Sequence, residues 1–173
     1  MFHHSALMVA ALNGHEKTVD ILLNAGADPM LKDTSGRSAL LLAASNNHLS
    51  LVVQLLDAGQ KWDQKDTHGN GIWHLMAMSD VEIEESETSY GSGQKEEGAS
   101  MIMHELISRG VLLDSLNSAG ETALMIAVKR EKVRTIKSLM ELGASPDIQT
   151  PDGETALTLA KTSGNDELVK LLR

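Results

Sequence analysis

The fold of this chain is decided by the stretch Ser38-Ala39-Leu40-Leu41-Leu42-Ala43-Ala44, which Gly36 introduces. The same arrangement returns along the chain at a constant interval. The step from Gly36 to Gly69 equals the step from Gly120 to Gly153, and both define a period of about 33 residues. The step from Gly69 to Gly120 is longer by roughly half a period, which indicates an insertion. A fixed period of this length indicates a stacked array of repeats.

Each period contains two short apolar runs with a polar turn between them. In the first unit the runs contain Leu7 and Leu22, and the turn is Asn13-Gly14-His15. Apolar residues spaced by one, three and four positions predict two short antiparallel helices. Ser5 is expected to cap the first helix with its hydroxyl group. Gly14 and Gly26 are expected to adopt left-handed conformations after the two helices.

The recurring positions read Gly-x-Ser/Thr-Ala-Leu-x-x-Ala-Ala, then Gly-His or a variant of it, then Leu-Leu-x-Ala-Gly-Ala-Asp. This pattern resembles the ankyrin repeat over nearly the whole chain. The resemblance implies an all-α ankyrin-repeat solenoid of stacked helix-turn-helix units with short hairpin-like loops. Where the family usually has Thr-Pro-Leu-His, alanine or isoleucine replaces the proline; because proline there only presets φ, the fold should not change. We expect a single domain of about five repeats, at approximately 3–32, 33–65, 66–116, 117–149 and 150–173.

The third unit departs most from the pattern. Gly71 occupies the capping position and supplies no side-chain oxygen, while Trp73 and Met76 replace smaller core residues. His74 is the only histidine at the family's usual histidine position, where the resemblance implies a bond to nearby backbone. The insertion, residues 79–96, is expected between the inner and outer helices. Its second half has the composition of a Gly/Ser linker, which predicts a mobile surface loop.

Composition and charge narrow the classes of function. The chain has no cysteine, which excludes disulfides, thiolate metal sites and a cysteine nucleophile. The net charge is −9, and residues 80–97 carry −6 of it. Phosphate recognition needs a concentrated basic face, so nucleic-acid binding is not expected. Because no apolar run is long enough to insert into a membrane, we expect a soluble, intracellular protein, cytoplasmic or nuclear.

No motif in the sequence points to catalysis. A His-Glu-x-x-His zinc motif, a phosphate-binding Gly-rich loop and a Gly-x-Ser-x-Gly nucleophile motif are all absent. We therefore expect no enzyme activity, no cofactor and no metal ion within these residues. His15 and His48, one period apart, are expected to bond backbone at the turns. The hydroxyl residues near the acids offer possible phosphorylation sites: Ser79, Ser86, Thr88, Ser89 and Tyr90.

The resemblance implies that a partner binds the concave face, which is formed by hairpin tips and inner helices. Trp62 is either an anchor for a partner or packs against Trp73 or the next hairpin. Lys129-Arg130 is a basic spot that could meet an acidic peptide or the chain's own acidic loop. The candidate partner-binding residues are Arg37, Asn46, Trp62, His68, Asn70, Met78, Glu121, Lys129, Arg130, Asp152 and Glu154.

The sequence therefore predicts a non-catalytic scaffold that binds another protein or peptide, with a monomer as the favoured state. Both ends of the array resemble internal repeats, which suggests that it forms part of a larger protein. An alternative is a regulatory or substrate-recruiting module of a multidomain enzyme. In that case residues 80–97 would act as an autoinhibitory pseudo-ligand or as a phosphorylated element.

Overall fold

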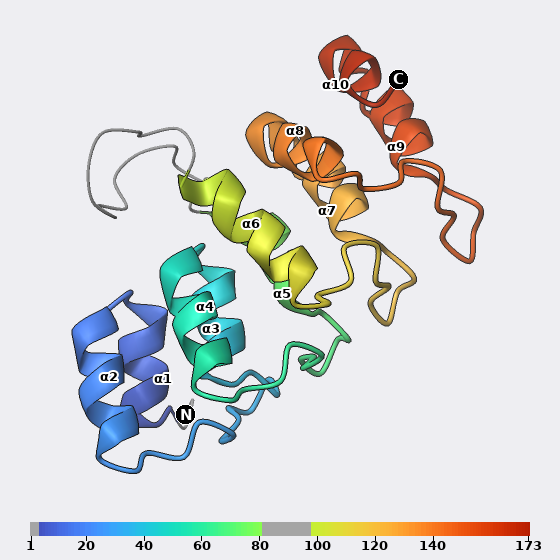
Figure 1. Ribbon diagram of the computed structural model, residues 1–173. Coiled ribbons are helices and arrows are strands. Elements are labelled where there is room, and N and C mark those ends of the chain that lie inside the picture. Colours follow the sequence, from blue (N-terminus) through green and yellow to red (C-terminus); the bar gives the residue numbers. More distant parts are fainter. Residues whose placement is uncertain (1–3, 81–97) are drawn as a thin grey trace.

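The computed structural model describes residues 4–80 and 98–173 of the chain. The elements within these ranges are ten helices arranged as five consecutive pairs (Figure 1). The pairs are α1 (Ala6–Leu12) with α2 (Glu16–Asn24), α3 (Ala39–Ser45) with α4 (Leu49–Asp57), α5 (Ile72–Met78) with α6 (Gly98–Ser108), α7 (Ala123–Lys129) with α8 (Val133–Glu141), and α9 (Ala156–Ser163) with α10 (Asp166–Leu171). The prediction of stacked helix pairs is confirmed.

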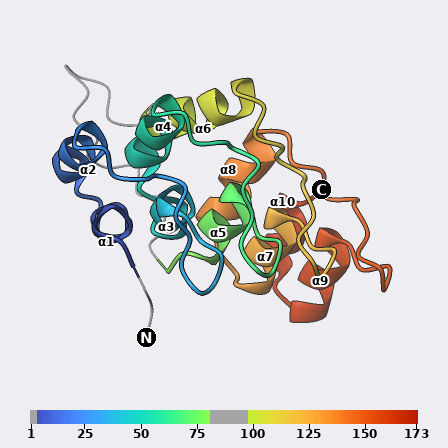
Figure 2. The same cartoon turned by 90° about the horizontal axis from the view of Figure 1, so that it is seen from below.

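The inner helices form the spine of the stack. Figure 2 shows α1, α3, α5, α7 and α9 following one another in a row, and each packs against the next. Every residue of α3 from Ala39 to Ala44 is at most 1% exposed. Small alanines allow these helices to approach closely, and leucines fill the space between them. Trp73 of α5 is the largest fully buried side chain, with 1% of its surface exposed.

The predicted Ser5 cap of α1 is confirmed, and Thr122 and Thr155 cap α7 and α9 in the same way. The Ser5 hydroxyl accepts the Met8 N–H at 3.2 Å, and Thr122 does the same for Met125 at 3.3 Å. Gly71 has no side chain to offer; its own N–H instead donates to Nδ1 of His74 at 3.3 Å. Gly14 and Gly26 take positive φ angles of 73° and 83°, as expected.

The interruption of the third unit lies where it was expected. Helix α5 ends at Met78 and its partner α6 begins at Gly98, so the extra residues separate an inner from an outer helix. The prediction that this segment is a mobile surface loop concerns residues 81–97, which lie outside the described residues. Four of the five candidate phosphorylation sites fall in the same range. The fifth, Ser79, is 3% exposed, which argues against its modification in the folded chain.

Candidate functional site

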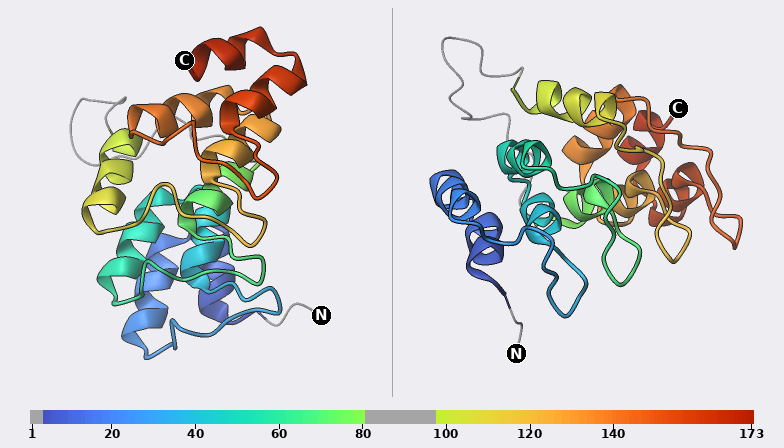
Figure 3. Two further views of the ribbon diagram at one scale, coloured as in Figure 1. Left: turned by 90° about the vertical axis from the view of Figure 1, so that its right-hand side faces the viewer. Right: turned by 60° about the horizontal axis from the view of Figure 1, so that its bottom comes forward.

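Four loops project on the same side of the stack, between one helix pair and the next (Figure 3). Each loop closes on a main-chain bond across four residues, as between Asp33 N and Arg37 O at 2.9 Å. We call these loops tips one to four, at residues 33–37, 66–70, 117–121 and 150–154. Backbone bonds join neighbouring tips, because Thr67 N–H donates to Ser35 O and Ser118 N–H donates to His68 O, both at 2.9 Å. The first three tips are therefore held in register by backbone bonds rather than by side chains alone.

A polar side chain at the first position of each tip fixes the shape of the loop. The Asp33 carboxylate accepts the N–H groups of Ser35 and Arg37, both at 2.9 Å. Asp66 and Asn117 accept both equivalent N–H groups of the second and third tips, and Thr150 accepts the N–H of Glu154 in the fourth. These side chains were absent from the predicted site. The signal that could have found them is the spacing, since each stands three residues before a tip glycine.

Asp33 is the most constrained of these groups. Its side chain is completely buried, and it also accepts hydrogen bonds from the Arg37 guanidinium at 2.9 to 3.0 Å and lies 3.3 Å from His4. Burial on its own raises the pKa of this carboxyl group, but the hydrogen bonds and positive charge of Arg37 outweigh it, so the pKa is lowered. The guanidinium group of Arg37, a predicted site residue, is therefore paired with Asp33 within its own tip.

Asn70 corrects the predicted site. It was expected on the exposed surface of the second tip, but its side chain is only 4% exposed. Its amide group donates to Asp66 at 3.0 Å, and its oxygen accepts a hydrogen bond from Asn117 of the next tip at 3.1 Å. A short polar residue can reach both neighbours from this position, so Asn70 joins two tips instead of facing a partner.

His74 and His48 both bond backbone of a neighbouring unit. His48 Nε2 lies 3.1 Å from Leu12 O, which confirms the expectation for that histidine. His15 occupies the equivalent place before α2, but its side chain is exposed and no such bond is seen for it among the described residues. His74 Nε2 lies 3.0 Å from Glu121 O, and burial lowers the pKa of this histidine.

The basic spot at the end of α7 is paired within the chain. Lys129 Nζ lies 2.7 Å from Glu121 Oε1, a contact that raises the pKa of Lys129 and lowers that of Glu121. Arg130 donates to the main-chain oxygen of Met78 at 2.8 Å and lies 3.4 Å from the fully exposed carboxylate of Asp80. The two side chains remain 43% and 46% exposed, so a partner's acid could compete for them.

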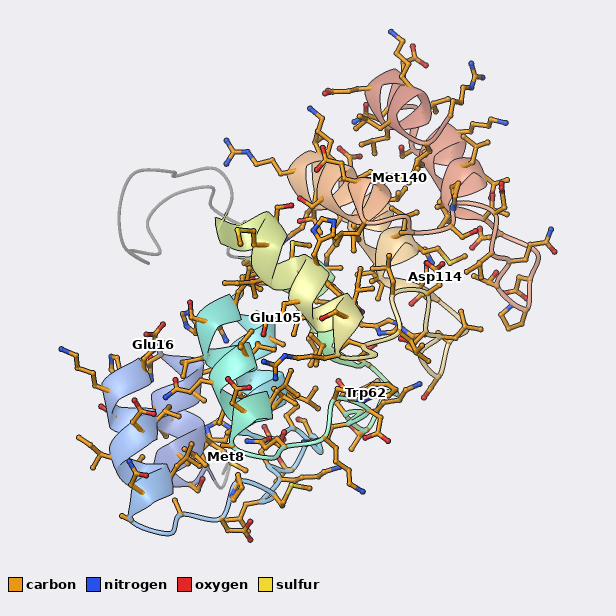
Figure 4. The ribbon with its side chains drawn as sticks, in the orientation of Figure 1. Met8, Glu16, Trp62, Glu105, Asp114 and Met140 are labelled. Atoms are coloured by element: carbon orange, nitrogen blue, oxygen red, sulfur yellow. The ribbon has the colours of Figure 1, made fainter. Side chains whose placement is uncertain are left out.

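Trp62 lies on the loop after α4 (Figure 4). The edge of its indole ring covers Gly110, where a Cβ atom would stand 3.7 Å from three ring atoms. The residue as a whole is nevertheless 36% exposed. Of the two alternatives, packing against the next loop is observed, while Trp73 is buried separately. The exposed part of Trp62 is still available to a partner.

The other predicted residues lie either at the tips or at helix ends. His68, Asp152 and Glu154 are exposed at the tips. Asn46 and Met78 are half-buried near the ends of inner helices, and the Asn46 amide donates to Leu42 O at 3.1 Å. These predicted residues thus lie on tips two and four and at the ends of α3 and α5.

No group of three His, Asp or Glu side chains that could hold a metal ion occurs among the residues described. The same residues contain no helix long and apolar enough to cross a membrane. The surface offers hydrogen-bonding and charged groups on a fixed backbone.

Comparison with known proteins agrees with this architecture. A family model described as "Ankyrin repeats (3 copies)" matches residues 2–79 and again residues 95–173. The chain is similar to "Inactive serine/threonine-protein kinase TEX14" of Bos taurus, at 33% identity over 67 residues, which are 39% of this chain and 4% of that protein. It is also similar to the protein of the same name in Mus musculus, at 28% identity over 76 residues, 44% of this chain and 5% of that protein. The chain thus matches only a small part of these relatives' length.

Proposed function

The chain belongs to the ankyrin-repeat family, and from this premise we propose that it binds another protein or peptide segment without catalysing a reaction. Ankyrin repeats are in general protein–protein interaction modules. We place the partner on the surface made by the tips and the ends of the inner helices. We also infer an intracellular location, mainly cytoplasmic, with which a sequence free of cysteine is compatible.

The observation that carries this proposal is the set of backbone bonds between successive tips. Thr67 to Ser35 and Ser118 to His68 fix three tips relative to one another before any partner arrives. Because the scaffold is already ordered, binding costs little conformational entropy. His68, Lys129 and Arg130 then present side chains of different chemistry on a surface that keeps its shape.

The experiment starts with a pull-down by the whole chain, followed by mass spectrometry, to identify a partner. Affinity is then measured for a double variant, Lys129→Glu with Arg130→Glu. The matched control, Lys137→Glu with Lys170→Glu, makes the same change of charge on exposed positions of the outer helices α8 and α10. We expect the first variant alone to lose binding, with unfolding curves confirming that both are folded. Equal affinity for the two variants would remove the basic pair from the surface.

A second candidate is a regulatory or substrate-recruiting module of a larger polypeptide. The relatives favour it, since they are named inactive kinases and share only a small part of their length with this chain. The contact between Arg130 and Asp80 favours a role for the acidic segment, because it holds the start of that segment beside the ends of the inner helices. Deleting residues 80–96 tests an autoinhibitory role: tighter partner binding supports it, and unaltered binding counts against it. Phosphorylation of the segment should alter the same affinity.

A further inference from the structure

Two of the three prolines in the chain follow a hydroxyl residue. The two pairs, Ser145-Pro146 and Thr150-Pro151, lie close together on the segment that leads from α8 to α9. A serine or threonine directly before proline is the sequence that proline-directed protein kinases recognise. Each pair could therefore accept a phosphoryl group, and the surroundings of the two hydroxyl groups decide between them.

The hydroxyl group of Thr150 is enclosed within tip four. The residue is 8% exposed, and its hydroxyl oxygen accepts the Glu154 N–H at 3.1 Å. Its main chain is fixed as well, because the Thr150 N–H donates to Glu154 O at 2.9 Å. A kinase would have to unfold tip four to reach this hydroxyl group. Thr150 is therefore not an acceptor in the folded chain.

Ser145 differs from Thr150 in each of these respects. It is half-buried, its hydroxyl group forms no hydrogen bond among the described residues, and its oxygen is not one of the fully buried polar atoms. Residues 145–149 form no main-chain to main-chain hydrogen bond within the described chain. Pro146 has no N–H to donate and disfavours a helical conformation of Ser145. The Ser145 hydroxyl group is thus open to solvent on a segment that a kinase can bind in extended form.

The polar contact that fixes Ser145 comes from the loop after α6, residues 109–116. The Asp114 carboxylate (Figure 4) accepts the Ser145 N–H with both oxygens, at 3.1 and 3.2 Å. Burial raises the pKa of Asp114 and outweighs the hydrogen bond from Ser145, which lowers it. The negative charge of this carboxylate is therefore poorly solvated. Because the hydroxyl oxygen and the bonded nitrogen belong to the same residue, a group attached to that oxygen would stand beside the carboxylate.

The junction that this contact crosses lacks a bond that the earlier junctions have. The N–H groups of Thr67 and Ser118 join tips one, two and three. The equivalent residue of tip four is Pro151, which has no N–H to donate. Among the described residues no main-chain bond joins tips three and four. The contact between Asp114 and Ser145 therefore supplies the hydrogen bonds between these two successive segments.

We propose that Ser145 is the acceptor site of a proline-directed protein kinase, and that a phosphate on it separates the loop after α8, residues 142–149, from Asp114. Ser145 Oγ attacks the γ-phosphorus of ATP, and an Oγ–P bond forms while the bond to the β–γ bridging oxygen breaks. The hydroxyl proton passes to the base of the kinase, and ADP leaves. The phosphate adds about −1.5 to −2 charges beside a carboxylate. Repulsion between these groups opposes the hydrogen bond from the Ser145 N–H, at a junction that has no main-chain bond to compensate.

The test of the site is incubation of the whole folded chain with ATP and a purified cyclin-dependent kinase, and in parallel with a mitogen-activated kinase. Mass spectrometry of the digested chain then locates the phosphate. We expect phosphate at Ser145, its loss in the variant Ser145→Ala and its retention in the matched control Thr150→Val. No phosphate with either kinase, or phosphate at other positions only, would overturn the proposal.

The effect of the phosphate is measured by amide hydrogen exchange, followed by NMR, in the phosphorylated and the unmodified chain. We expect the Ser145 amide to exchange about tenfold faster after phosphorylation, because it loses its acceptor. Asp114→Asn is the matched control, since its amide oxygen can still accept the N–H but carries no charge. Phosphate should accelerate exchange much less in that variant. Equal acceleration in both chains, or none in the natural chain, would contradict a separation driven by charge.

Discussion

His74 Nε2 lies 3.0 Å from the main-chain oxygen of Glu121 and joins the start of α5 to the following hairpin tip. On the other side of the ring, Nδ1 accepts the Gly71 N–H at 3.3 Å. A ring nitrogen that accepts carries no proton, so the neutral histidine has its proton on Nε2 and donates it to Glu121. The side chain is fully buried, and burial lowers its pKa. One neutral imidazole thus binds the Gly71 N–H at the start of α5 and links two repeats.

This arrangement predicts that acid weakens the fold through His74. The folded state holds the neutral ring, while the unfolded chain gains a proton below the ordinary histidine pKa of about 6.5. Stability from this group is therefore complete above that pH and is lost as the pH falls through the lowered pKa. Urea unfolding at pH values of about 7.5 and 5.5 should show the loss.

The variant His74→Gln should be less stable at neutral pH by about 2 kcal/mol, because it leaves a gap and strains two buried hydrogen bonds. It should also have a smaller difference in stability between the two pH values. The exposed His68→Gln is the control and should keep the natural difference. If both variants respond to acid as the natural chain does, His74 is not the titrating group.

Asp33 should give the largest effect among the tip residues. Its buried carboxylate accepts backbone hydrogen bonds and pairs with Arg37, so removal leaves a cation and two N–H groups without their acceptor. We expect Asp33→Ala to lower the free energy of unfolding by about 2 to 3 kcal/mol at neutral pH. The exposed Asp63→Ala should change it by less than about 0.5 kcal/mol.

The pH dependence of this effect has a defined sign. The pKa of Asp33 is lowered in the folded state, so its contribution is present above the unfolded value of about 3.9 and is lost as the pH falls through the folded value. The difference between Asp33→Ala and the natural chain should therefore shrink in strong acid. Chemical unfolding of both proteins over the acid range measures it, and a constant difference would contradict the assignment.

Features that depend on the repeat period could be predicted from the sequence. The hydrogen-bond partners of individual side chains could not. Stacked helix pairs and the Ser5 cap follow from spacing and residue type, and the resemblance to the ankyrin repeat implied the backbone bond of His74. The burial of Asn70 could not be predicted, because it depends on Asn117 arriving from the next tip. The pairing of Arg130 with Met78 O likewise depends on how two inner helices end side by side. Such contacts depend on how successive repeats are placed in space, and the sequence pattern does not contain this information.

The turn before α8 lacks the glycine found in the first unit, and Glu131 takes the left-handed conformation with φ of 53°. The equivalent Gly14 and Gly164 have φ of 73°. In this left-handed region a residue with a Cβ atom is less stable than glycine by about 1 kcal/mol or more. We expect Glu131→Gly to stabilise the chain by about 0.5 to 1 kcal/mol, measured by thermal unfolding. Glu131→Ala is the control and should give no gain, since alanine keeps the Cβ atom; a gain there would point to the charge instead.

Ser38 opens the most regular unit, yet its hydroxyl group does not cap α3. Its oxygen is buried without a hydrogen-bond partner among the described residues, whereas Thr122 caps α7 through the Met125 N–H. An unpaired buried hydroxyl is unfavourable, and a capping hydroxyl is favourable by about 1 kcal/mol. Ser38→Ala should therefore leave stability unchanged or raise it, while Thr122→Ala should lower it by about 1 kcal/mol. Denaturant midpoints of the two variants decide the matter, and an equal loss in both would mean that Ser38 forms a cap in solution.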